Sequence, residues 1–545
     1  MTDLEAAARA WLAADPDPAT RAETQALLDA HDHAGLAARF GGRLAFGTAG
    51  LRGPLGAGPL RMNRVVVQQT SAGLARFLLA RGDAPSAVVG YDGRHNSQVF
   101  AEDAAAVLAG AGVAVVLLPR ALPTPVLAFA VRDLRVSAGV MITASHNPAP
   151  DNGYKLYLGD ADGGSQLVAP ADQQVLEAIE AVVAERVAPP RGTDVTIAGE
   201  DLLARYVRAT AAVASDTAAG PLPWVYTAMH GVGLETVQRV LVAAGLPLPA
   251  VVPEQAHPDP DFPTAPFPNP EEPGTLDLAF ALAAETGAEL VLANDPDADR
   301  LAVAIPEGHG FRRLTGNETG LLLAWRIASR AQQAGGVLAC SIVSTPGLAR
   351  IADRFGLLAV ETLTGFKWIS RVPGLLLGFE EALGYLVDPE VVRDKDGVSA
   401  LVAVLATAVE LRAEDRGLAD LLAEIEEAIG RFDSDQVSIR VDDLAVLGRM
   451  VDGLRQEPPS EIGGLAVESV DDLAVGGDLP PTEGLRYRLA GGARVVIRPS
   501  GTEPKLKVYL DVVSTAPTPE ARRAETAAAL DALRAAVHPL LTFRR

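Results

Sequence analysis

Residues 87–118 read AVVGYDGRHNSQVFAEDAAAVLAGAGVAVVLL, and this stretch decides the fold class. Two apolar runs typical of buried strands, at 87–92 and 113–118, enclose a segment at 101–112 that has helical spacing and ends in glycine. A strand, a helix and a second strand in this order form a crossover unit of a parallel sheet. The run VSAGVMIT at 136–143 predicts a further strand, so an α/β domain is expected.

The same alternation returns twice further along the chain, which predicts two more α/β blocks. The strand-like runs and the helices of these blocks lie at 224–231, 235–245 and 289–295, and then at 337–344, 346–356 and 357–362. From about residue 435 the pattern changes to short strands followed by a terminal helix at 518–537. We therefore predict three tandem mixed-sheet α/β domains and a smaller C-terminal α+β domain, with the bounds 1–205, 206–320, 321–434 and 435–545.

Two segments fall outside this alternation. Residues 1–40 have apolar residues at helical spacing and predict two short helices. Residues 253–274 contain eight prolines, a density that neither a helix nor a central strand tolerates. We expect this second segment to be an extended loop that crosses a surface, with Phe262 and Phe267 available to dock it.

Composition excludes several classes of protein. The 545 residues fit three or four domains, and the net charge of −22 argues against nucleic acid or an anionic membrane as a partner. No apolar run is long enough for a transmembrane helix, and the N-terminus carries acids where a signal peptide needs bases, so we expect a cytoplasmic protein. Cys340 is the only cysteine, which excludes disulfides and cysteine-built zinc sites.

Two motifs follow predicted strands, at the sheet edge where open α/β sheets bind ligands. The first is TASHNP (143–148), which contains Ser145 and is followed by Lys155; an ordinary Asn-Pro turn is the alternative. The second is NDPDADR (294–300), whose acids at alternate positions in extended backbone would share one side of a loop and suit Mg²⁺. A solvated acidic loop is the alternative, although three crowded carboxylates repel one another without a cation.

Two further motifs suit a phosphosugar. GFEEALGY (378–385) brackets paired acids with glycines, which suits hydrogen bonds to hydroxyls, and a solvated turn fits this motif equally well. RPSGTEPK (498–505) combines arginine, two hydroxyls and a glycine, as in a phosphate cradle; a turn between strands is the alternative. No nucleotide-binding P-loop is present, so nucleotide-driven phosphoryl transfer is not indicated.

Taken together and in this order, the four motifs resemble those of the α-D-phosphohexomutase family. FGTAGLR (46–52) is also similar to the first phosphate-site loop of that family, and the resemblance extends from about residue 45 to the C-terminus. It implies four domains around a central cleft. It also implies a phosphosugar mutase that moves a phosphoryl group between C1 and C6 of a hexose through an enzyme phosphoserine and a sugar bisphosphate, with a sugar 1,6-bisphosphate as activator.

The resemblance implies roles for individual residues. Ser145 would carry the phosphoryl group, with Lys155, His146 and Arg52 as its catalytic neighbours. One Mg²⁺ per chain would be held by the carboxylates of Asp295, Asp297 and Asp299 together with an oxygen on Ser145. The substrate-binding residues would be Arg300, Thr364, Gly365, Lys367, Glu380, Arg498, Ser500, Gly501, Thr502 and Lys505.

The choice of sugar stays open. Ala382 stands where many hexomutases have serine, and TGFKW (364–368) resembles the lysine-bearing loop of glucose-preferring mutases. The motif set is most similar to the branch with phosphopentomutases and glucose 1,6-bisphosphate synthases, so C1/C5 transfer on a pentose and bisphosphate synthesis are the alternatives. Outside this class, a metal-dependent sugar phosphatase or a phosphosugar-binding protein remains. We expect a monomer or weak dimer.

Overall fold

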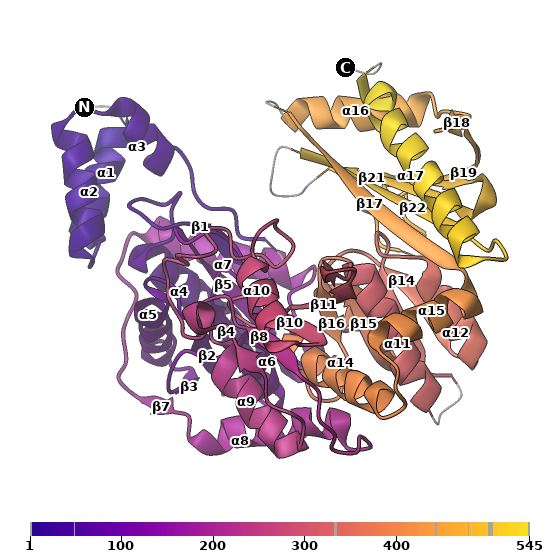
Figure 1. The fold of residues 1–545 in the computed structure, drawn as a ribbon. Helices are drawn as coiled ribbons and strands as arrows, with labels where there is room; N and C mark the ends of the chain where they lie inside the picture. Colours follow the sequence, from indigo (N-terminus) through magenta and orange to yellow (C-terminus); the bar gives the residue numbers. More distant parts are fainter. Residues whose placement is uncertain are drawn as a thin grey trace. The chain divides into compact units, whose positions relative to one another are not determined.

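The structure, a computed structural model, describes residues 3–47, 50–331, 335–441, 444–477, 479–499 and 505–542. The chain forms two compact units: the first unit comprises Met1–Leu314 and Gly384–Glu414, and the second unit comprises Thr315–Leu383 and Asp415–Arg545. The predicted fold class is confirmed, because three α/β sheets are followed by an antiparallel sheet with its own helices (Figure 1). The exact bounds of the four domains stay a prediction.

The first sheet of the first unit has the order β1-β5-β4-β2-β3-β7, with β6 added beside β5. Its strands β4, β2, β3 and β7 are parallel, whereas β5 runs antiparallel to β4, β1 and β6. The strands are β1 (Leu51–Pro54), β2 (Ser86–Tyr91), β3 (Ala114–Leu117), β4 (Ala138–Ile142), β5 (Asp151–Leu158), β6 (Ser165–Gln166) and β7 (Val195–Ile197).

Helices cover both faces of this sheet, which explains why its central strands are continuous apolar runs. The helices α4, α5 and α7 share one buried cluster with alternate residues of β2 and β4 (Figure 1). On the other face, Gly90 and Gly139 leave room for Leu127 of α6. The helices of this part are α4 (Arg64–Arg81), α5 (Ser97–Gly110), α6 (Thr124–Asp133), α7 (Ala171–Glu185) and α8 (Glu200–Ala211), with the short 3₁₀ turns η1 (Asp160–Asp162) and η2 (Ala212–Ala214).

The second sheet of the first unit has the order β12-β11-β10-β8-β9, in which β10, β8 and β9 are parallel. The largely apolar helix α14 packs against β10 and β11, although it comes much later in the chain. The elements are β8 (Trp224–Thr227), α9 (Gly233–Ala244), β9 (Ala250–Val251), η3 (Pro253–Gln255), α10 (Asp277–Thr286), β10 (Leu290–Asn294), β11 (Leu301–Glu307), β12 (Gly310–Arg313), β16 (Gly384–Leu386) and α14 (Gly397–Arg412).

The second unit contains parallel strands in the order β14-β13-β15 and an antiparallel sheet in the order β17-β22-β21-β20-β19-β18. Helices α16 and α17 share the core of the antiparallel sheet. The elements are α11 (Gly316–Arg330), β13 (Val337–Ser341), α12 (Gly347–Phe355), β14 (Leu358–Thr362), α13 (Phe366–Ile369), β15 (Leu375–Glu380), α15 (Leu418–Ile429), β17 (Arg431–Arg440), α16 (Leu444–Gln456), β18 (Glu461–Ile462), β19 (Leu465–Asp472), β20 (Leu485–Leu489), η4 (Ala490–Gly492), β21 (Arg494–Pro499), β22 (Lys505–Ser514) and α17 (Pro519–Thr542).

The N-terminal segment differs from its prediction, because it forms three helices rather than two. These are α1 (Asp3–Ala14), α2 (Pro18–Asp29) and α3 (His33–Phe40). The backbone of His31 is left-handed at φ +48°, and the carboxylate of Asp32 then accepts a hydrogen bond from the amide of Gly35. An aspartate cap of this kind starts a new helix, and the helical spacing of the apolar residues continues across it.

The proline-rich loop matches its prediction. Between η3 and α10, residues 256–276 form turns and irregular backbone. Phe262 is buried, with the guanidinium of Arg94 over its ring at 4.9 Å, and Phe267 is partly exposed. Phe262 therefore anchors the loop to Arg94, whereas Phe267 stays exposed.

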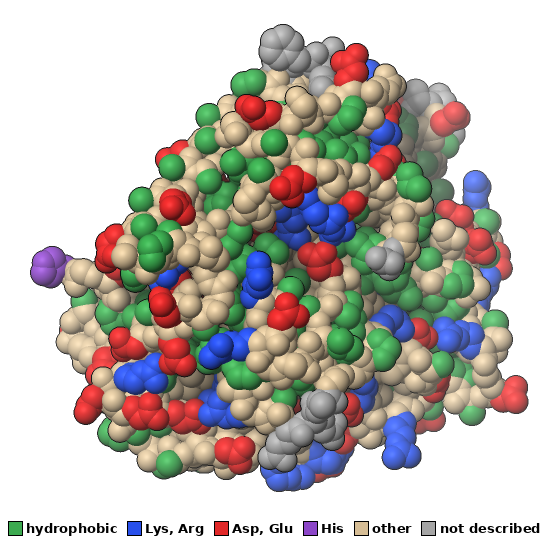
Figure 2. Space-filling view, turned by 90° about the vertical axis from the view of Figure 1, so that its right-hand side faces the viewer, with side chains coloured by type: hydrophobic (Ala, Val, Ile, Leu, Met, Phe, Trp, Pro, Cys, Tyr) green, Lys and Arg blue, Asp and Glu red, His purple; other side chains and the backbone are tan. Residues whose placement is uncertain are grey.

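Two further observations concern the helices and the surface of the described chain. No helix in the described ranges has the length and hydropathy needed to cross a bilayer. Over the face drawn in Figure 2, acidic and basic side chains are interspersed among apolar ones.

Candidate active site

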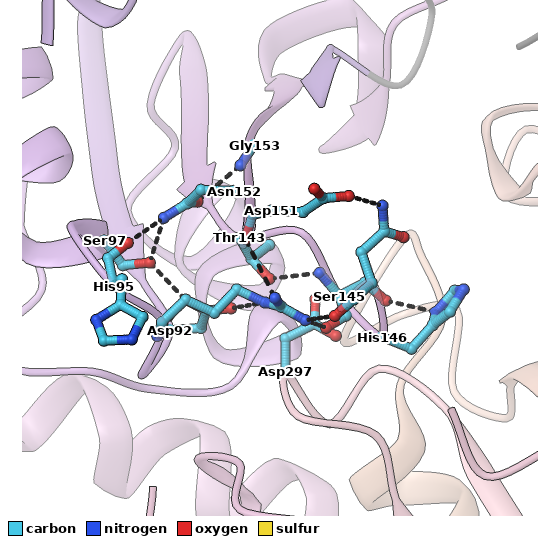
Figure 3. Close-up of polar contacts among 12 residues, drawn as sticks. Asp92, His95, Ser97, Thr143, Ser145, His146, Asp151, Asn152, Gly153 and Asp297 are labelled. Atoms are coloured by element: carbon cyan, nitrogen blue, oxygen red, sulfur yellow. Dashed lines mark hydrogen bonds and ion pairs between the residues drawn. The ribbon is translucent and has the colours of Figure 1, made fainter. Parts of the chain in front are cut away.

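Ser145 lies on a tight loop that follows strand β4. Its backbone is left-handed at φ +54°, a strained conformation for serine that is concentrated at functional sites. The hydroxyl of Thr143 accepts a hydrogen bond from the amide of Ser145 at 2.8 Å (Figure 3). The loop therefore holds the side chain of Ser145 in a fixed direction at the end of the sheet.

The hydroxyl of Ser145 contacts two possible proton partners. Its Oγ donates to Oδ2 of Asp295 at 2.9 Å and lies 3.1 Å from Nδ1 of His146. Ser145 itself is 2% exposed. A buried serine hydroxyl between a carboxylate and an imidazole suits a nucleophile or a phosphoryl carrier.

The three aspartates predicted as metal ligands converge after strand β10. Asp295, Asp297 and Asp299 are fully buried, and one carboxylate oxygen of each lies within 4.8 Å of the others. They form the only group of three or more potential metal-binding side chains in the described ranges. The predicted reason was partly wrong, because the loop is a turn with Ala298 at φ +54° rather than extended backbone.

Two carboxylate oxygens of the aspartate cluster lack hydrogen-bond donors, although Lys155 and Lys395 bond the other oxygens of Asp297 and Asp299. Burial and the neighbouring carboxylates of Asp297 and Asp299 raise the pKa of Asp295 well above its usual value. The Oδ1 atoms of Asp297 and Asp299 are buried and have no hydrogen-bond partner. Buried unpaired carboxylate oxygens are costly, and a divalent cation removes that cost. The cluster is therefore able to hold a metal ion.

Lys155 reaches the same cluster from strand β5. Its Nζ donates to Oδ2 of Asp297 at 2.8 Å and to Oδ2 of Asp299 at 2.9 Å. Burial lowers the pKa of Lys155, but the two aspartates more than reverse this effect, and the net shift is upward. Conversely, burial raises the pKa of Asp297, but the Lys155 ammonium and the hydrogen bonds from Thr124 and Asp295 together bring it below its usual value. Lys155 is therefore held as a cation.

His146 is held as a neutral imidazole. Burial lowers its pKa well below the usual value, and the nearby positive charges of Arg300 and Arg52 lower it further. Its ring lies 6.4 Å from that of Phe267, in the proline-rich loop. A neutral imidazole has one N–H donor and one acceptor nitrogen, so it can share a hydrogen bond with the hydroxyl of Ser145.

Arg52 and Arg300 lie around the same two loops. Arg52, on β1, donates from Nη1 to Oδ1 of Asn147 at 3.1 Å. The amide of Arg300 donates to Oδ1 of Asp295 at 3.0 Å, and its Nε lies 3.9 Å from Oδ1 of Asp299. The first unit thus brings together all of the predicted residues from the serine and aspartate motifs.

The second unit brings together several of the predicted sugar-binding residues. The amide of Gly365 donates to Oε1 of Glu380 at 2.6 Å, and Arg498 donates to the hydroxyl of Thr364 at 2.6 Å. Gly365 has φ +111°, which a residue with a side chain rarely adopts. The ammonium of Lys367 lies 5.6 Å from the ring centre of Trp368.

The phosphate cradle is only partly described. Arg498 lies near the end of β21 and Lys505 begins β22. Ser500, Gly501 and Thr502, predicted to hold phosphate, lie outside the described residues.

Several residues that support the site were not predicted from the sequence. Arg94 donates to the carbonyls of residues 145, 147, 148 and 151. The hydroxyl of Thr124 donates to Oδ2 of Asp297 at 2.6 Å, and the ammonium of Lys395 lies 3.3 Å from Oδ2 of Asp299. Asn294 donates to the carbonyl of Arg300 at 2.6 Å, which closes the aspartate loop. Position at a strand or helix end was the only sequence signal for Arg94 and Thr124.

Four family models match the chain in order. They are described as phosphoglucomutase/phosphomannomutase alpha/beta/alpha domain I (residues 43–186), domain II (204–308), domain III (315–428) and C-terminal domain (439–529).

Individual proteins of known sequence or structure are similar to this chain over most of their length. A Haemophilus influenzae protein named "Probable phosphomannomutase" is 49% identical over 453 residues, which cover 83% of this chain and 93% of that protein. The phosphopentomutase of Mus musculus is 35% identical over 561 residues, covering 92% of this chain and 89% of that protein. A solved structure of a phosphoglucomutase/phosphomannomutase family protein from Burkholderia thailandensis has a TM-score of 0.70 at 22% identity, and the match covers 90% of this chain and 96% of that chain; this likeness supports the fold.

Proposed function

Because the chain belongs to the phosphoglucomutase/phosphomannomutase family, we propose that it moves a phosphoryl group between C1 and C6 of a hexose phosphate, with Ser145 as the carrier. Membership of this family makes it an isomerase, an intramolecular phosphotransferase. One observation carries the assignment of Ser145: its hydroxyl lies 2.9 Å from Asp295, in the cluster that can hold a cation.

The metal in this proposal is one Mg²⁺ per chain, held by Asp295, Asp297, Asp299 and an oxygen on Ser145. Carboxylate oxygens are hard ligands of the kind that Mg²⁺ prefers, and the buried Oδ1 atoms without hydrogen-bond partners support this choice. When bound, Mg²⁺ neutralises charge on the transferred phosphoryl group.

Transfer proceeds in two halves in this proposal. In the first, the bond between phosphorus and Oγ of Ser145 breaks as the phosphoryl group passes to the free hydroxyl of the sugar. The sugar hydroxyl gives up its proton and Oγ of Ser145 takes one up, so the products are a sugar bisphosphate and free Ser145. In the second, the other phosphate of that bisphosphate returns to Ser145. His146, 3.1 Å from Oγ, exchanges the serine proton. Lys155 and Arg52 supply positive charge at the reacting end.

Residues of the second unit bind the substrate in this proposal. Glu380 would accept hydrogen bonds from sugar hydroxyls, and Gly365 would orient it through the amide at 2.6 Å. The remaining predicted residues would hold the sugar and the phosphate that is not reacting. They are Arg300 from the aspartate loop and, from the second unit, Thr364, Lys367, Arg498, Ser500, Gly501, Thr502 and Lys505. A sugar 1,6-bisphosphate would act as activator, because it rephosphorylates Ser145 when the intermediate is lost.

Glucose 1-phosphate is our proposed substrate. The lysine-bearing loop that contains Lys367 favours it over mannose 1-phosphate. Ribose 1-phosphate is the second candidate, because the relative named phosphopentomutase covers 92% of the chain and because Ala382 removes a hydroxyl contact. Because the Haemophilus influenzae relative is named a probable phosphomannomutase, mannose 1-phosphate is also included among the sugars to be tested.

The setting of the enzyme is also proposed. We propose a cytoplasmic monomer or weak dimer with a phosphosugar as its ligand and with neither nucleic acid nor membrane as a partner. We propose domains at 1–205, 206–320, 321–434 and 435–545.

Two measurements test the proposed function. Intact mass should show a fraction of the purified protein heavier by one phosphate, and Ser145→Ala should remove both this species and turnover. Ser71→Ala, a matched change at a buried serine bonded to Tyr154, should keep both. The kcat/KM values for glucose, mannose and ribose 1-phosphate, with glucose 1,6-bisphosphate present, then identify the sugar. A fully active Ser145→Ala enzyme would refute the phosphoserine route.

A further inference from the structure

A second buried lysine reaches the aspartate loop, in addition to Lys155. The ammonium of Lys395 lies 3.3 Å from Oδ2 of Asp299, and its side chain is 12% exposed. Lys395 belongs to the segment between β16 and α14, which is distant in the chain from the loop that it touches. Asp299 thus has two ammonium groups at one of its two carboxylate oxygens.

The carboxylate of Asp394 fixes the position of Lys395. Its Oδ1 lies 3.4 Å from the Lys395 ammonium and accepts a hydrogen bond from the Lys395 amide at 2.8 Å. Its Oδ2 accepts from the hydroxyl of Tyr157 at 2.8 Å and from the side-chain amide of Gln166 at 2.6 Å. All of the carboxylate oxygens of Asp394 are therefore bonded, although Asp394 is fully buried.

Strand β5 supports both lysines. Lys155 and Tyr157 are two positions apart on this strand and therefore share a face. Lys155 contacts Asp297 and Asp299 directly, whereas Tyr157 acts through Asp394 and Lys395. Gln166 stands opposite Tyr157 in the register of β6 against β5, so both donors to Asp394 come from one rigid hairpin.

In Asp297 and Asp299, the two carboxylate oxygens have different environments. The Oδ2 atoms of Asp297 and Asp299 are bonded by Thr124, Lys155 and Lys395. The Oδ1 atoms of the same two aspartates are buried and have no hydrogen-bond partner, although Nε of Arg300 lies 3.9 Å from Oδ1 of Asp299. Bonds to one oxygen fix the plane of a carboxylate, and groups that orient metal ligands in this way contribute strongly to metal affinity.

We propose that Asp394 is a positioning residue for the metal site: it holds the Lys395 ammonium against Oδ2 of Asp299, which keeps Oδ1 of Asp299 directed toward a bound divalent cation. This inference rests on the proposed function, because it takes the aspartate cluster as the cation site. Loss of Asp394 removes a negative charge and the restraint on Lys395, and both changes weaken cation binding.

The chain offers a matched control two residues away. Asp396 is also buried, also accepts from a tyrosine, Tyr206 at 3.0 Å, and caps α14 through the amides of Val398 and Ser399. The hydrogen bonds of its carboxylate go to Tyr206 and to the first turn of α14. Asp396→Asn and Tyr206→Phe therefore reproduce the changes of Asp394→Asn and Tyr157→Phe without touching Lys395.

The test is a double-mutant cycle in full-length protein with Mn²⁺ as the probe, its affinity measured by electron paramagnetic resonance. Asp394→Asn should weaken Mn²⁺ binding about tenfold, and Tyr157→Phe, which keeps the charge, should weaken it by less. In a Lys395→Met background, Asp394→Asn should weaken Mn²⁺ binding by clearly less than it does in wild type, because only the loss of the negative charge remains once the path through Lys395 is gone. Asp396→Asn and Tyr206→Phe should leave Mn²⁺ affinity unchanged.

Three outcomes would overturn the inference: no effect of Asp394→Asn on Mn²⁺ affinity, an equal effect in the Lys395→Met background, or an equal loss in Asp396→Asn. If Asp394→Asn does not fold, the same comparison is made with Tyr157→Phe, and an unchanged affinity there is a refutation. The proposed function is judged separately on wild-type protein, which must bind Mn²⁺ and turn over phosphosugar whatever the variants do.

Discussion

Arg94 donates a hydrogen bond from Nη2 to the backbone carbonyl of Ser145 at 2.6 Å. The same guanidinium reaches the carbonyls of Pro148 and Asp151 at 3.0 and 3.2 Å, and it is 4% exposed. Its Nε lies 3.4 Å from the buried carboxylate of Asp92. One arginine therefore fixes the loop that gives Ser145 its left-handed backbone.

We predict that Arg94→Lys lowers kcat by about 100-fold, because a point charge cannot bond several carbonyls and small misplacements of reacting groups are costly. Arg94→Met should in addition cost about 3–5 kcal/mol of unfolding free energy, since it leaves Asp92 buried without its ion pair. Urea unfolding and steady-state kinetics check both effects. Arg76→Met, which breaks an exposed pair with Glu185, should cost about 1 kcal/mol or less. Equal losses in Arg76→Met and Arg94→Met would contradict the prediction.

We predict that removal of the metal abolishes activity. EDTA-treated protein should lose turnover and regain it with Mg²⁺, and Asp297→Asn should lower both metal affinity and kcat by at least about tenfold. The melting temperature should fall, because the variant weakens the buried ion pair of Asp297 with Lys155, but relief of repulsion among the three carboxylates offsets part of this loss. Asp201→Asn, at a carboxylate that is 74% exposed, is the control and should behave as wild type. Full activity after EDTA treatment would refute the assignment.

The sequence predicted the residues that would carry phosphate and bind the metal better than it predicted the residues that hold them in position. Ser145 and the three aspartates could be found because each motif is continuous and follows an apolar strand. Arg94, Thr124 and Lys395 could not, because only the tertiary fold brings them to those motifs. Lys395 lies 96 positions after Asp299, and no local pattern marks that distance. The prediction of helix boundaries near His31 was wrong for a different reason: the helical spacing of apolar residues continues across the break between α2 and α3.

We predict that Asp396 makes the protein less stable as the pH rises through the acid range. Burial raises its pKa to about 6, above the value of about 3.9 for an unfolded aspartate. The folded state therefore binds the extra proton between these values, and this group's contribution falls by about 3 kcal/mol from below pH 4 to above pH 6. Asp396→Asn lacks this titration, so its melting temperature relative to wild type should rise over that range. A constant difference would contradict the prediction.

We predict that Arg494 is required for the stability of the second unit. Its guanidinium donates to Asp511 at 2.8 Å and to Glu361 at 2.8 Å, and both Arg494 and Asp511 are buried. Arg494→Met leaves the Asp511 charge without its main partner and should cost about 3–5 kcal/mol. Adding Asp511→Leu should recover part of that loss, because an apolar pair carries no buried charge. Thermal unfolding checks both variants, and a double variant less stable than Arg494→Met would contradict this account.

The last prediction concerns the sugar. Ala382 follows the paired acids Glu380 and Glu381, and a serine there could hold a sugar hydroxyl that alanine cannot. One such hydrogen bond is worth about 0.5–1.5 kcal/mol, or a few-fold to tenfold in rate. A pentose offers fewer hydroxyls for this loop to hold, so Ala382→Ser should raise kcat/KM for glucose 1-phosphate relative to ribose 1-phosphate by that factor. The ratio is measured with glucose 1,6-bisphosphate present. The account of Ala382 fails if the ratio is unchanged. A second outcome would contradict the account of Lys367: wild-type enzyme using mannose 1-phosphate about tenfold faster than the other two sugars, a difference of about 1.4 kcal/mol. The role of Ser145 is tested separately and would not be affected by that result.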